Sequence, residues 1–118
     1  MWFPSEDAKK YLTATLNLPA CGNEQDWEIE MSDASRVPEF LDIYGRGGLS
    51  GEYRRALASL IIASFEDSIW EGKFSERHWK MFSEMIREHL DEIEGVLAPW
   101  TQVEGDGYAI TIRLRDIV

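Results

Sequence analysis

The stretch from residue 51 to residue 70 restricts the fold more than any other part of the chain. Apolar residues at helical spacing form one side of it, and other apolar residues extend around it: Leu57, Leu60, Ile61 and Phe65, then Ala56, Ala58, Ile62 and Ala63. A helix that is apolar nearly all round is buried at the centre of a protein. The stretch therefore predicts a central helix on which the other elements pack.

Three further segments carry apolar residues at helical spacing. The first follows Ser5, a residue type that caps helices, and runs to Leu16 with Glu6 and Asp7 in its first turn. The second spans about residues 35–44. The third begins after Ser75 and has a longer apolar stripe: Trp79, Phe82, Ile86, Leu90, Ile93 and Leu97. We expect this stripe to pack on the central helix, with Phe82, Ile86 and Leu90 against Leu60, Ile61 and Phe65.

Two segments show strict alternation instead. Acidic and apolar residues alternate at positions 26–31, and a second alternation covers positions 108–114. Period two is typical of a half-buried strand, and a strand needs a partner for its backbone groups. We expect the two strands to pair and to bury one set of side chains: Trp27, Ile29, Met31, Ile110, Ile112 and Leu114. The predicted fold is α+β, a mainly helical single domain over residues 1–118 with about four helices and a small antiparallel two-stranded sheet.

The charge of the chain indicates the kind of partner. Its 22 Asp and Glu residues exceed its 12 Lys and Arg residues, which gives a net charge of −10. Such a field repels nucleic acid and anionic membranes and attracts basic proteins. Residues 24–42 hold seven acidic residues against Arg36 alone, a concentration that solubility does not require. We predict a basic protein partner, no nucleic acid and no membrane, with five carboxylates at the binding surface: Asp26, Glu28, Glu30, Asp33 and Asp42.

Motifs for catalysis or cofactor binding are absent from the sequence. His78 and His89 are eleven residues apart on one predicted helix, hence about 16 Å apart along its axis and too distant to share a metal ion. Cys21 is the only cysteine, which excludes an intramolecular disulfide and a cysteine-built zinc site. The glycine-rich segment 45–48 lacks the Gly-Lys-Ser/Thr ending of a phosphate loop. We expect no catalytic residue, no metal site, no cofactor and no enzymatic activity.

The sequence also predicts a location. Its first residues lack the basic and apolar regions of a secretory signal, and no window approaches the roughly 20 apolar residues of a membrane span. We expect a cytoplasmic protein.

Four segments carry a resemblance to a known family. They are residues 25–30 (QDWEIE), 32–36 (SDASR), 39–44 (EFLDIY) and 60–67 (LIIASFED). They resemble a family of small acidic bacterial proteins, the immunity proteins of polymorphic-toxin and contact-dependent growth inhibition systems. The resemblance covers about residues 25–67 and implies that the chain binds and neutralises a cognate toxin domain, often a basic nuclease, by stoichiometric occlusion.

Two other functions are compatible with the sequence. One is a regulator that imitates nucleic acid and blocks a DNA-binding protein with its spaced carboxylates. The other is a small-ligand or metal-binding protein that uses a carboxylate-rich helix, whose acidic residues are Glu88, Asp91, Glu92 and Glu94. The calcium-loop pattern is missing there, so a solvated helix face is the simpler interpretation.

Overall fold

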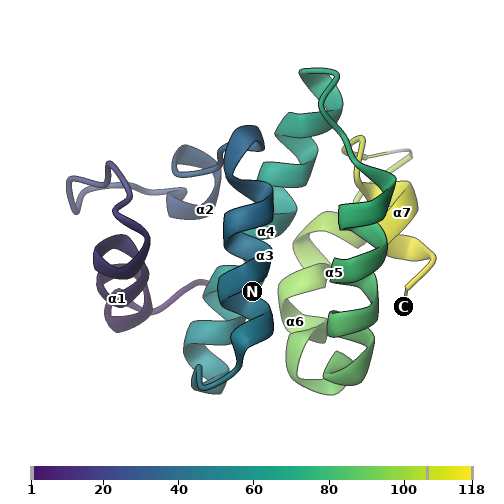
Figure 1. Ribbon diagram of the computed structural model, residues 1–118. Helices are drawn as coiled ribbons and strands as arrows, with labels where there is room; N and C mark the ends of the chain where they lie inside the picture. Colours follow the sequence, from purple (N-terminus) through teal and green to yellow (C-terminus); the bar gives the residue numbers. More distant parts are fainter. Residues whose placement is uncertain (1, 106, 118) are drawn as a thin grey trace.

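The computed structural model describes residues 2–105 and 107–117, and every regular element in these ranges is helical (Figure 1). The elements are α1 (Glu6–Leu16), α2 (Trp27–Glu30), the 3-10 turn η1 (Ala34–Arg36), α3 (Val37–Arg46), α4 (Gly51–Trp70), α5 (Glu76–Glu88), α6 (Leu90–Thr101) and α7 (Thr111–Arg115). The predicted α+β fold is wrong, because neither expected strand of the sheet exists among the described residues.

Helix α4 is the centre of the fold, as its sequence predicts. It contacts α1, α2, η1, α3 and α6, and its residues 56–65 are all buried. Ser50 caps its first turn by accepting a hydrogen bond from the Tyr53 amide, and Gly72, with a φ of +69°, follows its last turn. No helix of the described ranges is both long and apolar enough to cross a membrane.

An aromatic cluster joins α4 to α5. The Phe65 ring lies 5.1 Å from that of Trp79, 5.7 Å from that of Phe82 and 5.8 Å from that of Phe74, measured between centroids. Tyr44 of α3 meets Phe82 edge to face at 5.9 Å. The predicted contact between Phe65 and Phe82 is therefore confirmed, and the contact between α3 and α5 extends the same cluster.

The helix predicted from Ser75 to Leu97 is in fact two helices. The chain turns at His89, which has φ −130° and ψ 35°, and α5 and α6 lie side by side (Figure 1). A continuous helix over residues 76–101 would be about 39 Å long, whereas the longest extent of the molecule is 33 Å. The turn lets α5 pack on α3 while α6 packs on α4 and α7.

The segment predicted as the first strand forms the single helical turn α2. Trp27 and Met31, four residues apart, are buried on one side, while Ile29 is 50% exposed on the other. The Trp27 indole Nε1 donates a hydrogen bond to the Thr13 hydroxyl of α1 at 3.3 Å. Spacing by four, which is one helical turn, thus decides burial here rather than alternation by two.

The segment predicted as the second strand leads into α7 and shows the same pattern. Ile110 and Leu114 are fully buried and Ile112 is 58% exposed. The Glu66 carboxylate of α4 accepts hydrogen bonds from the backbone amides of Ile110 (2.8 Å) and Ala109 (3.3 Å). A side chain therefore satisfies two of the backbone amides for which a partner strand was expected.

Candidate functional site

Three of the five predicted binding carboxylates lie together on α2. Asp26 precedes the turn, Glu28 and Glu30 belong to it, and the Glu30 carboxylate accepts a hydrogen bond from the Asp26 amide at 3.1 Å. Asp33 is instead used locally, since it accepts from the Ser35 amide at the start of η1. Asp42 belongs to α3 and pairs with Arg46 one turn later. The acidic site on α2 thus comprises Asp26, Glu28 and Glu30.

Beside this acidic turn lies an open hollow of about 370 Å³, which we name the α2–α6 groove. Its wall is formed by the N-terminal segment, α2, α4, α6 and the loop before α7. Its lining is mainly apolar and aromatic: Trp2, Phe3, Asp26, Glu28, Ile29, Ser59, Val96, Pro99, Trp100, Gln102, Val103 and Tyr108. Three of the large apolar side chains that the fold leaves exposed, Phe3, Ile29 and Tyr108, belong to this set. Exposed apolar side chains gathered in one hollow are typical of an interaction surface.

Glu28 is the half-buried charge of the groove. Partial burial, with the nearby carboxylates of Asp26 and Glu30 adding to it, raises the pKa of Glu28 above its ordinary value, although Lys9 opposes this change. Lys9 itself is paired with Glu6 at 2.9 Å. A hydrogen bond from the backbone of Glu28 itself to its carboxylate also works against the rise in pKa. Glu28 forms no ion pair among the described residues, so within these ranges the groove contains an acidic group without a paired cation.

The far wall of the groove is held in place by hydrogen bonds from α7. Arg115 donates to the carbonyls of Thr101 (3.2 Å), Val103 (2.9 Å) and Gly105 (3.0 Å), which fixes the loop after α6. Thr111 donates to the Trp100 carbonyl at 2.7 Å and accepts from the Tyr108 amide at 2.9 Å. These contacts set the Trp100 and Tyr108 rings 4.8 Å apart. The aromatic wall is thus formed before any partner arrives.

A second hollow of about 470 Å³ adjoins the groove along α6, with Trp2, Pro99 and Gln102 lining both. Gly95, which has no side chain, and Pro99, one turn later, form part of its floor. Because proline has no amide hydrogen, Pro99 cannot donate the helical hydrogen bond to the Gly95 carbonyl. The two hollows thus share lining residues of α6 and of the N-terminal segment.

Sequence reasoning found the acid of this site but missed its apolar part. Trp100 and Tyr108 are distant in sequence from α2, and Trp2 and Phe3 come from the other end of the chain. Only the fold brings these segments together. One residue gave a sign of this apolar surface in the sequence. Ile29 lies between two acidic residues, a position that is compatible with exposure on a helix.

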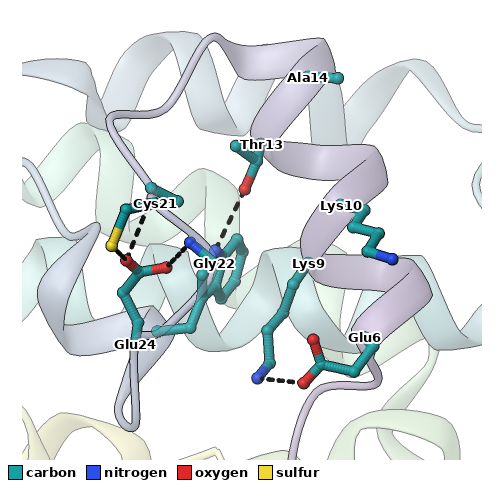
Figure 2. A pocket seen from close by; sticks show the side chains of 10 residues that line it. Glu6, Lys9, Lys10, Thr13, Ala14, Cys21, Gly22 and Glu24 are labelled. Carbon is teal, nitrogen blue, oxygen red and sulfur yellow. Dashed lines mark hydrogen bonds and ion pairs between the residues drawn. The ribbon is translucent and has the colours of Figure 1, made fainter.

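Another hollow, of about 340 Å³, lies beside α1 and is shown in Figure 2. Most of its charged groups are paired within the chain, Lys10 being the exception. The Glu24 carboxylate accepts hydrogen bonds from the Cys21 thiol (2.8 Å) and from the amides of Cys21 (2.9 Å) and Gly22 (3.1 Å), and these bonds hold the pKa of Glu24 at about 2. Lys9 is turned to Glu6. The two acidic groups of the hollow are thus already paired within the chain.

A smaller hollow of about 130 Å³ contains Tyr44, Arg54 and His89. Arg54 forms a largely buried ion pair with Glu92 at 2.6 Å, and burial raises the pKa of Tyr44 to about 12. The Tyr44 hydroxyl and the second Glu92 oxygen are buried and have no hydrogen-bond partner among the residues that the structure describes. One acid of the carboxylate-rich helix is thus used to tie α6 to α4.

Within the described ranges, no three His, Cys, Asp or Glu side chains are placed to hold a metal ion. The two histidines no longer share a helix, since His78 lies in α5 and His89 at the turn after it. Of the carboxylate-rich helix, Asp91 and Glu94 are exposed.

We expect Glu28→Gln to raise the free energy of unfolding by up to about 1 kcal/mol at pH 7. A carboxyl group whose folded pKa lies above its unfolded value destabilises the folded state once both forms are ionised, and this cost disappears as the pH falls through the folded pKa. The gain should therefore shrink toward zero at pH 4. Urea denaturation of both proteins at the two pH values measures it.

The control for this prediction is Glu30→Gln, because Glu30 is exposed and an amide oxygen can still accept from the Asp26 amide. Its effect should stay within about 0.5 kcal/mol at both pH values. A gain for Glu28→Gln that is the same at pH 7 and pH 4 would contradict the expected raised pKa.

The chain was compared with protein-family models, with curated proteins and with solved structures, and none of the three comparisons gives a match.

Proposed function

We propose that this protein is a bacterial immunity protein that acts in the cytoplasm, where it binds a basic toxin domain and neutralises it by stoichiometric occlusion. The observation that carries the proposal is the α2–α6 groove, in which Asp26 and Glu28 border a preformed apolar hollow. The resemblance of residues 25–67 to such immunity proteins supports the same function, and a nuclease is the kind of toxin it favours.

The two parts of the groove suit the two demands on an inhibitor. A net charge of −10 speeds the encounter with a basic protein by roughly ten- to thousand-fold at low salt. Apolar and aromatic side chains in a preformed hollow give the complex a long lifetime, since binding energy concentrates in buried anchors at the centre of an interface. Occlusion needs no chemistry from the inhibitor, which agrees with a site built from binding residues.

The experiment is co-expression with the toxin domain encoded next to the gene. We expect the wild-type protein to restore growth and to bind the purified toxin domain one to one. The triple variant Asp26→Asn, Glu28→Gln, Glu30→Gln should bind at least tenfold more weakly, because these carboxylates meet the basic partner. Calorimetry and stopped-flow association at two salt concentrations measure the loss.

The matched control changes the global charge by the same amount elsewhere, through Glu84→Gln, Asp91→Asn and Glu94→Gln, three exposed positions on α5 and α6. This variant should keep its affinity within about threefold. Growth that is not restored by the wild-type protein would contradict the proposed function. Capture of a DNA-binding enzyme whose DNA site the protein blocks would favour the nucleic-acid mimic instead.

A further inference from the structure

The lining of the α2–α6 groove combines an apolar part with an acidic part. Trp100 and Tyr108 form the apolar wall, held by Thr111 and Arg115, while Glu28 lies on α2 with Ile29 beside it. A hollow of about 370 Å³ is within the range of about 300–1,000 Å³ in which small ligands and side chains are bound. The groove can therefore receive one large side chain and a neighbouring charged group.

The charged group that fits this place is a cation. Glu28 is half-buried and lacks an ion pair among the described residues, and Asp26 lines the same hollow. The Asp26 side chain forms no capping hydrogen bond with α2. Bringing a cation to a partly desolvated carboxylate replaces the water that the site has lost, and the attraction is stronger there than on an open surface.

We propose that the α2–α6 groove binds a short segment of the partner protein in which a large apolar or aromatic side chain is adjacent to a lysine or arginine. The apolar side chain lies against Trp100, Tyr108 and Ile29, and the cation pairs with Glu28 and Asp26. The inference rests on the proposed function for its occupant, a basic protein, and assigns the surface by which that protein is held.

The charge of the groove decides against other occupants. A second copy of the chain would bring a second net charge of −10 toward the first. A symmetric contact through this groove would also place the Glu28 carboxylates of both copies near each other. Nucleic acid and anionic membranes carry the same sign of charge as the groove. A cationic and apolar protein segment is the occupant that satisfies both ends.

The test uses three small probes that share an indole ring and differ in the charge of the side chain. They are tryptamine, a cation; tryptophol, neutral; and indole-3-propionate, an anion. Each is titrated into the ¹⁵N-labelled full chain at low salt, and shifts are followed at Ile29, Val103, Tyr108 and the Trp100 indole. We expect tryptamine to bind about tenfold more tightly than indole-3-propionate, with tryptophol between them.

Two variants separate the two ends of the groove. Glu28→Gln should reduce the preference for tryptamine over indole-3-propionate to less than about threefold, while the affinity for tryptophol stays the same. Ile29→Ser, at an exposed position, should weaken all three probes alike by roughly three- to tenfold and leave the preference for the cation intact. Circular dichroism checks that both variants are folded.

Several results would overturn the proposal. They are equal affinity for the cationic and anionic probes, shifts that cluster in the hollow beside α1, and a dimer, found by sedimentation, that Ile29→Ser dissociates. The test is independent of any toxin. If the probes behave as expected but no toxin domain is neutralised, the proposed function is contradicted and the proposed binding by the groove is supported. If wild type, Glu28→Gln and Ile29→Ser all neutralise a toxin domain equally well, the proposed binding by the groove is contradicted and the proposed function is supported.

Discussion

Phe65→Ala is expected to lower the free energy of unfolding by about 3–5 kcal/mol. The Phe65 ring is 1% exposed and contacts the rings of Phe74, Trp79 and Phe82, so its loss leaves a cavity between α4 and α5. Because these rings also hold each other, they cannot simply collapse into the space. Urea denaturation followed by circular dichroism measures the loss.

Two other variants bracket this result. Phe65→Leu retains most of the apolar volume and should cost less than about 2 kcal/mol. Phe3→Ala, at a side chain that is 67% exposed, should change stability by no more than about 0.5 kcal/mol. A loss below about 1 kcal/mol for Phe65→Ala would show that the aromatic cluster is not the core.

Trp27→Ala is expected to cost a similar amount, about 3–5 kcal/mol. Trp27 is the only fully buried residue of α2 and is 1% exposed, and its indole Nε1 donates to Thr13 of α1. A single helical turn has no stability of its own, since helix nucleation is unfavourable. We therefore expect the turn that carries Asp26 and Glu28 to lose its fixed position when the indole is removed.

The matched variant is Trp27→Phe, which keeps an aromatic ring in the site but cannot donate to Thr13. It should lose about 1–2 kcal/mol and retain partner binding within a few fold. The two variants are compared by urea denaturation and by the amide shifts of residues 26–31. If Trp27→Ala unfolds at the same urea concentration as wild type, α2 is held by something other than its tryptophan.

The sequence predicted the helices α1, α3 and α4, whereas the predicted sheet is wrong for a reason visible in α2 and α7. In both segments apolar residues alternate, yet the buried pairs, Trp27 with Met31 and Ile110 with Leu114, are four residues apart. In a segment of only six or seven residues, positions four apart also belong to an alternation by two, so the two patterns cannot be told apart from these positions. The residue between the members of each pair decides, and both Ile29 and Ile112 are exposed.

The amino-acid composition of the segment was a further indication that α2 is helical. Asp and Glu are depleted in strands, whereas Glu and Met are good helix formers, so the segment 26–31 favours a helix on propensity. The turn at His89 had no such indication, because neither glycine nor proline marks it. There the limited size of the core decides, as the molecule is shorter than the continuous helix would be.

The candidate site was predictable only in its charge. Acidic residues that are close in sequence stay close in the fold, which is why Asp26, Glu28 and Glu30 were found. Asp42 lies apart from them on α3, where it pairs with Arg46. The apolar wall depends on contacts between segments some 80 residues apart, and no local pattern reports these.

The residues of the groove and those of the aromatic cluster are entirely different side chains, and this separation bears on how specificity can evolve. Exchanging an exposed residue such as Phe3, Ile29 or Tyr108 changes stability by about 0.5 kcal/mol or less, yet it alters the shape that a partner meets. Exposed residues of the groove can therefore change one at a time, and partner choice with them, while Phe65, Trp79 and Phe82 stay constant. The same independence makes the scaffold suitable for redirecting toward a chosen basic target by randomising only the exposed positions of the groove.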